Sequence, residues 1–68
     1  MTMPSDFSTM IPFHDQSERQ QGFFYVRRVG PLVAITISLQ HGGDVEASFE
    51  PEIAGKLIAA LNQAVQRP

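Results

Sequence analysis

The chain has 68 residues, no cysteine and a formal net charge of −2 at pH 7. This length allows one small domain with a marginal core, and the missing cysteines exclude disulfides and thiolate metal sites. Self-association or a partner is the expected source of further stability. The acidic balance lacks the basic footprint of a nucleic-acid-binding protein. No apolar run approaches the ~18 residues of a membrane span and no secretory signal pattern is visible, so a cytoplasmic protein with no membrane contact is expected.

Residues 1–21 contain two prolines, several Ser and Gln residues and no sustained hydrophobic period. This composition predicts a flexible N-terminal arm. Its one apolar stretch, Met10–Phe13, either packs on the edge of the domain or serves as a docking segment for a partner. The remaining residues, 22–68, are predicted to form a single domain.

Two strands are predicted first in this domain. Gly22–Val29 is rich in aromatic and β-branched residues, Gly30-Pro31 is a turn signal, and Leu32–Gln40 alternates apolar with small or polar residues. Val33, Ile35, Ile37 and Leu39 therefore share one face of the second strand.

A glycine turn and a third strand, Val45–Phe49, follow. A three-residue loop, His41–Gly43, would place Leu39 opposite Val45, Ile37 opposite Ala47 and Ile35 opposite Phe49, with all these apolar pairs on one face. Such a loop needs a residue in the left-handed region, which Gly43 provides at little cost.

A helix is predicted from about Pro51 to Gln66, because Pro is favoured at the first helical position. One stripe of this helix is apolar and has helical spacing; its members are Ile53, Leu57, Ala60, Leu61 and Ala64. Three further apolar residues widen the stripe, namely Ala54, Ile58 and Val65.

The predicted fold class is therefore α+β, a three-stranded antiparallel meander followed by one C-terminal helix packed on one face (βββα). The first strand is apolar on both faces, since Phe23, Tyr25 and Val29 point one way and Phe24 and Val26 the other. The length of the Gly30-Pro31 loop leaves open which set faces the helix. Either way, apolar side chains emerge on the face away from the helix, which is typical of an interface. Homodimerisation and coverage by the N-terminal arm are the two alternatives.

No constellation of catalytic or metal-ligating residues stands out. His14-Asp15 lies in the predicted arm and His41 and Asp44 in a hairpin loop, without the three or four converging ligands that a metal needs. Ser38 and Ser48 have no assigned base for a triad, and so small a chain leaves little room for a pocket. The sequence predicts no enzyme, no cofactor and no metal.

The predicted partner-binding residues lie on the first strand, because aromatic and Arg side chains are the usual anchors of interfaces. They are Phe23, Phe24, Tyr25, Arg27 and Arg28. The same residues support an alternative, in which the aromatic rings stack on the bases of a single-stranded nucleic acid and the arginines contact phosphates. The net acidity of the chain argues against nucleic acid as the partner.

A secondary interface is predicted at Ile58 and Val65 of the helix and at Glu46 and Glu50. Glu46 and Glu50 belong to an acidic edge with Asp44 and Glu52. Such charge usually protects an edge strand from aggregation; the sharper alternative is imitation of a phosphate backbone.

The segment Leu32–Val65, with its Gly-Gly-Asp turn and Pro-Glu helix start, resembles short uncharacterised strand–turn–strand–helix proteins of bacteria and their phages. Members often carry Thr or Ser before the helix proline, where this chain has Glu50. The resemblance covers half of the chain and implies a fold but no activity. By size and charge, it suggests a phage or bacterial accessory protein that modulates or inhibits a partner. The sequence thus predicts a small non-enzymatic protein-binding module that forms a homodimer and binds another protein.

Overall fold

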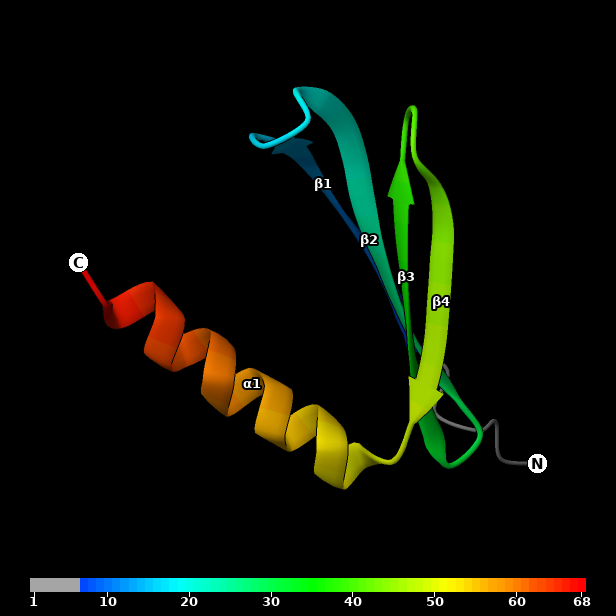
Figure 1. The fold of residues 1–68 in the computed structure, drawn as a ribbon. Coiled ribbons are helices and arrows are strands. Elements are labelled where there is room, and N and C mark those ends of the chain that lie inside the picture. The colour runs from blue at the N-terminus through cyan, green and yellow to red at the C-terminus, as the bar shows by residue number, and fades with distance from the viewer. Residues whose placement is uncertain (1–6) are drawn as a thin grey trace.

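The computed structural model describes residues 7–68. Its elements are β1 (Ser8–Asp15), β2 (Gln20–Val29), β3 (Leu32–Leu39), β4 (Gly43–Phe49) and α1 (Pro51–Gln66) (Figure 1). The four strands form one antiparallel sheet in the order β1-β2-β3-β4. The α+β class and the bounds of the helix are as predicted.

The predicted number of strands is wrong, because β1 occupies residues that were expected to be irregular. Ser8–Asp15 pairs along its whole length with β2, from Ser8 opposite Arg27 to Asp15 opposite Gln20. Pro12 obscured this strand in the sequence, yet an edge strand tolerates proline because one side of it needs no ladder hydrogen bonds. Met10–Phe13 is therefore part of the sheet. The first six residues of the predicted arm lie outside the described residues.

The β3–β4 hairpin has a three-residue loop, but it consists of residues 40–42 and its register differs from the prediction by two residues. Leu39 lies opposite Gly43 and Ile37 opposite Val45. Gly43 takes a φ of 81°, the left-handed conformation that follows such a turn. The hydroxyl of Ser38 donates to Oδ1 of Asp44 at 2.6 Å across the neighbouring pair. A shift of two residues keeps every side chain on its face, so the hydrophobic pattern alone could not choose between the two registers.

The helix leaves the sheet at an angle. Pro51 occupies its first turn and the backbone oxygen of Glu50 accepts from Ile53 and Ala54, although the Glu50 side chain makes no capping hydrogen bond. α1 approaches the sheet mainly at β3, close to its own N-terminal end, and then diverges from it (Figure 1). The sheet and the helix are therefore the two arms of a V.

The chain is open for its size. Its radius of gyration is 14.0 Å, whereas a compact domain of this length has a radius of about 11 Å. Among residues 7–68, Ala34 is the only buried apolar residue. The accessible surface of the chain is 5544 Å². This value exceeds by about 1,300 Å² the ~4,200 Å² that is typical of a folded monomer of this mass. Residues 7–68 of the single chain consequently have no hydrophobic core comparable to that of a stable domain.

Candidate binding surfaces

The register of the sheet assigns each side chain to one of two faces, since residues directly opposite each other on neighbouring strands point the same way. We call the face toward α1 the helix-side face; its apolar members are Phe7, Ile11, Phe13, Phe24, Val26, Val33, Ile35, Ile37, Leu39, Val45, Ala47 and Phe49. We call the opposite one the outer face; it holds Met10, Pro12, Phe23, Tyr25, Arg27, Thr36, Ser38, Asp44 and Glu46. One face is almost wholly apolar and the other is mixed.

The five residues predicted to bind a partner do not form one site. Phe24 and Arg28 lie on the helix-side face, whereas Phe23, Tyr25 and Arg27 lie on the outer face. The loop of residues 30 and 31 has two residues, which settles the orientation that the sequence left open. Aromatic side chains do emerge on the face away from the helix.

Two aromatic rings pack together on the helix-side face. The ring centroids of Phe13 and Phe24 are 4.6 Å apart with a 34° tilt. Gly22 makes this packing possible, because a Cβ there would lie 2.9 Å from Cζ of Phe13, from Cδ2 of Leu39 and from the backbone oxygen of Ser38. Glycine at this position therefore lets the ring of Phe13 lie across β2.

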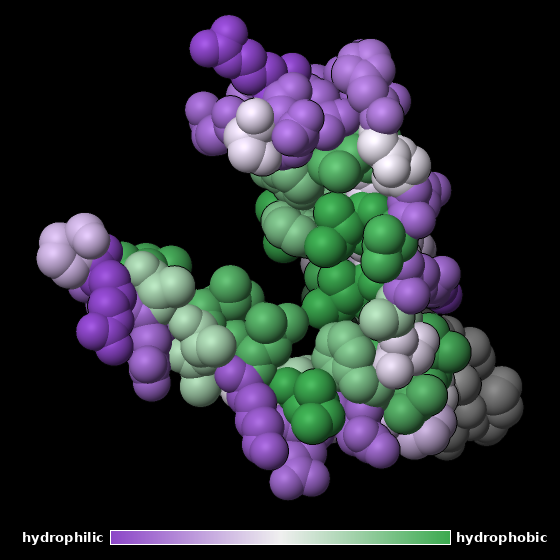
Figure 2. Space-filling model, viewed as in Figure 1, coloured by the Kyte–Doolittle hydropathy of each residue, from purple (hydrophilic) through white to green (hydrophobic). Residues whose placement is uncertain are grey.

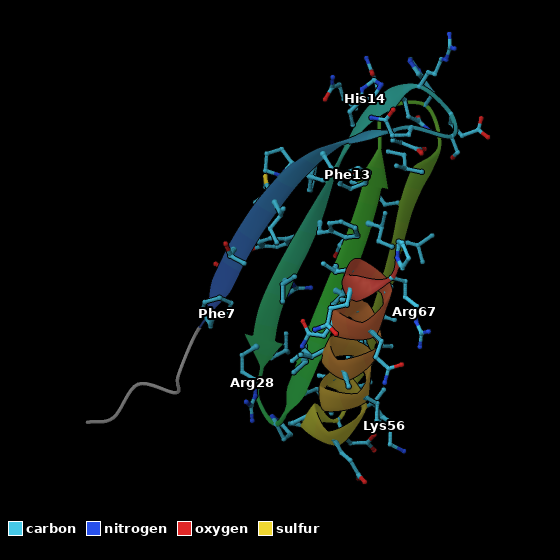
Figure 3. All side chains as sticks on the ribbon, turned by 90° about the vertical axis from the view of Figure 1, so that its left-hand side faces the viewer. Phe7, Phe13, His14, Arg28, Lys56 and Arg67 are labelled. Atoms are coloured by element: carbon cyan, nitrogen blue, oxygen red, sulfur yellow. The ribbon has the colours of Figure 1, made fainter. Side chains whose placement is uncertain are left out.

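One stripe of α1 faces the sheet. Ala54 and Ile58 line a cavity of about 310 Å³ with Val26 and Val33, and Leu61 and Val65 continue the same stripe at helical spacing. The sequence had placed Ala54, Ile58 and Val65 at the margin of the apolar stripe, but the structure turns this margin toward the sheet. Lys56 and Arg67 project on the side of α1 away from β1 (Figure 3).

Exposed apolar side chains concentrate between the sheet and the helix. Twelve large hydrophobic residues are exposed in the described chain, five on the helix-side face, five on α1 and two on the outer face. Figure 2 shows apolar surface on both arms of the V and polar residues at the hairpin end of the sheet. We call the space between the helix-side face and the Ala54–Val65 stripe the apolar cleft. Arg28, on the helix-side face, is among the residues that line the closed end of this cleft.

Several residues of this cleft were not recognised from the sequence. Ile37 and Val45 were recognised as members of an apolar face, but a helix packed flat on the sheet was expected to cover them. Ile11 fell within the predicted arm. A single 16-residue helix covers too little area for all the apolar residues of the sheet, and a count of these residues would have indicated that some stay exposed. The angle at which α1 leaves the sheet, by contrast, has no signature in the sequence.

The outer face is organised by one ion pair. Arg27 pairs with Glu46 across β3, and its guanidinium carbon lies 5.5 Å from the centroid of the Tyr25 ring. Ala34, opposite Arg27 in the register, is fully buried because the arginine side chain crosses β3 above it. The positive charge of Arg27 is thus matched within the chain.

A polar network ties the two hairpin turns together at the far end of the sheet. Gln20, which is 5% exposed, donates from Nε2 to Oδ2 of Asp15 at 3.2 Å and accepts from the backbone N–H of His41 at 2.8 Å. Oδ1 of Asp15 accepts from the hydroxyl of Ser17 at 2.9 Å and from its N–H at 3.1 Å. The Ser17 hydroxyl bond, with those from Gln20 and the turn backbone, holds the pKa of Asp15 below its ordinary value against the opposing effect of burial. This network is structural and defines where the apolar cleft ends.

The predicted secondary interface is divided between surfaces. Ile58 and Val65 lie on the stripe of α1 that lines the apolar cleft, Glu46 lies on the outer face in its ion pair, and Glu50 lies at the helix start. Ile58 and Val65 therefore lie on a different surface from Glu46.

No other type of site is apparent in the described part of the chain. Within residues 7–68, no cluster of three or more His, Asp or Glu side chains is arranged to hold a metal ion. Within the same range, no helix has the length and apolarity to cross a membrane. Comparison with protein-family models, curated proteins and solved structures returned no match. The two faces of the sheet are therefore the surfaces that bear on function.

Proposed function

We propose that this chain is a small non-enzymatic protein-binding module that works as a homodimer. The observation that supports this proposal most strongly is the apolar cleft, because eight of the twelve exposed large hydrophobic residues among residues 7–68 lie on the helix-side face or on the Ala54–Val65 stripe. Monomeric proteins rarely expose contiguous apolar patches of this kind. The surface excess of about 1,300 Å² is also larger than the about 800 Å² per partner that a standard interface buries.

The outer face is the proposed site for a different protein. A homodimer that closes the apolar cleft leaves Phe23, Tyr25 and Arg27 accessible, with Met10 and Pro12 beside them on β1. Aromatic and Arg side chains at the centre of a patch with a polar surround are typical anchors of protein interfaces. Asp44 provides an acidic group beside this patch, because Glu46 is already paired with Arg27, so a partner with an apolar centre and a basic residue opposite Asp44 fits it best. Such a role suits an accessory protein that modulates or inhibits its partner.

Nucleic acid is the competing ligand for the outer face. Tyr25 and Phe23 could stack on bases, but Arg27 is already paired with Glu46. A phosphate would have to displace this carboxylate while Asp44 repels it from the same face. The arrangement of charges thus favours protein over nucleic acid.

The experiment that tests the homodimer compares two charged variants of β4 by sedimentation velocity. Val45→Glu puts a charge into the apolar cleft, and Ser48→Glu puts the same charge on the outer face of the same strand as a matched control. We expect Val45→Glu to sediment as a monomer or to unfold, and Ser48→Glu to sediment as the unaltered dimer. If the unaltered chain and both variants all sediment as monomers and the variants have native circular dichroism, the proposal is wrong.

The outer face is tested separately with Tyr25→Ala and a fluorescent oligothymidine. The proposal expects the variant to remain dimeric, and expects the unaltered protein to bind the oligonucleotide weakly if at all. Tight binding that falls steeply with salt and is lost in Arg27→Glu would contradict a protein-binding outer face and establish the nucleic-acid alternative.

A further inference from the structure

Both arms of the apolar cleft have a half that the chain itself covers and a half that it leaves open. Near the start of α1, Val26 and Val33 of the sheet meet Ala54 and Ile58 of the helix around the cavity. Farther from this point, Ile37 and Val45 continue the same face of the sheet without a helix above them. Val45 is 68% exposed, so the open half of the sheet begins where α1 diverges.

The helix repeats this division. Along the stripe Ala54 is half-buried, whereas Ile58 is 60%, Leu61 55% and Val65 81% exposed, so the open part of the helix begins at Ile58. The stripe spans most of a helix about 24 Å long, and its second half reaches away from the sheet (Figure 1). A solvent-exposed apolar stripe of this length indicates a helix whose packing partner is missing from the single chain.

We infer that the partner is α1 of a second copy, and that each chain inserts the Leu61–Val65 half of its helix against the Ile37–Val45 half of the other chain's sheet. This inference rests on the proposed homodimer and specifies how it is built. A two-fold axis makes such an exchange reciprocal. The helix of the first chain packs on the sheet of the second, and the helix of the second packs in the same way on the sheet of the first. This helix-to-sheet contact, formed twice, covers the open half of the sheet and the open half of the helix stripe in each chain.

The chemistry of the two open halves supports a second copy over a foreign protein. Each chain supplies one uncovered apolar helix stripe and one uncovered apolar sheet surface. In a pair of copies, the helix stripe of each chain can therefore cover the sheet surface of the other. The open halves, represented by Ile37, Val45, Leu61 and Val65, carry no charge, as in the centres of permanent interfaces. A foreign partner would have to cover both a sheet and a diverging helix in every molecule for the chain to stay folded.

The reciprocal exchange is tested by cross-linking between two differently tagged chains. The protein has no cysteine of its own, so Val45→Cys in one chain and Val65→Cys in the other create the reactive pair. The two chains are mixed in denaturant, refolded together and treated with a short bis-maleimide. We expect a covalent heterodimer that contains both tags. Ser48→Cys with Val65→Cys is the matched control, since Ser48 lies on the outer face of the same strand, and it should give no heterodimer.

The outcomes separate this inference from the proposed function. A protein of dimeric mass in which Val45→Cys and Val65→Cys do not cross-link, or in which only the Ser48→Cys control does, would overturn the reciprocal exchange and leave the homodimer standing. A monomeric mass for the folded, unaltered chain would overturn both. Ile37→Cys with Leu61→Cys is a second pair that keeps the test decisive where one of the first variants fails to refold, and it should give the same heterodimer.

Discussion

Truncation of Leu61 measures the strength of the contact between the helix of one chain and the sheet of its partner. Leu61 is 55% exposed in the single chain, and full burial of a leucine side chain contributes about 1.5–3 kcal/mol. Burial of its exposed half therefore contributes about 1–1.5 kcal/mol per chain. The two-fold dimer makes this contact twice, so Leu61→Ala should weaken association by about 2–3 kcal/mol, which raises the dissociation constant about 30- to 150-fold.

The assay is sedimentation equilibrium of the unaltered chain, Leu61→Ala and Gln63→Ala over a range of concentrations. Gln63→Ala is the matched control, because it lies on the opposite side of α1 and also introduces a good helix former. Its dissociation constant should stay within a few-fold of that of the unaltered chain. Equal dissociation constants for Leu61→Ala and Gln63→Ala would refute the reasoning that places Leu61 in the interface.

Three further predictions concern the sheet itself. Gly22→Ala should destabilise the protein in urea by about 1–3 kcal/mol, because the new Cβ would lie 2.9 Å from a backbone oxygen of β3; unchanged stability would contradict this close approach. Gln20→Leu removes the acceptor of the His41 N–H and should cost about 1–3 kcal/mol, with faster hydrogen exchange at that amide; unchanged exchange would show that the bond does not matter. Since the pKa of Asp15 is lowered in the folded state, its hydrogen bonds stabilise the turn above about pH 4 and are lost as the pH falls through the lower folded value. The amide resonance of Ser17 should report this titration, and the same titration in Asp15→Asn would contradict the assignment.

The sequence predicted the second half of the fold better than the first. β2, β3, β4 and α1 all have strong local signals, and Pro51 fixed the start of the helix. β1 was missed because Pro12 and the polar residues around it suppress the strand signal. β1 forms a strand because it pairs with the free edge of β2, which is apolar on both faces, and such tertiary context decides strand formation more than the local sequence does.

The proposed interface was expected from the sequence in kind but at other residues. The sequence predicted apolar side chains on the face of the sheet away from the helix, and Ile58 and Val65 were expected in an interface. It assigned the principal binding role to β2 as a whole, whereas the register divides β2 between two faces with different properties. The turn geometry of residues 30 and 31 and the direction in which α1 leaves the sheet decide this division. Neither can be derived from hydrophobic periodicity, because both depend on backbone angles at a few turn positions.

The solution mass of the unaltered 68-residue chain decides whether a second chain completes the hydrophobic core. Light scattering on a size-exclusion column, repeated over a range of concentrations, should give about twice the chain mass of 7.5 kDa wherever circular dichroism shows folded protein. Thermal unfolding midpoints that rise with concentration would agree with this, since dissociation then accompanies unfolding. A folded, cooperatively unfolding monomer of 7.5 kDa would contradict the claim, because it would show that the chain is stable with its apolar cleft open.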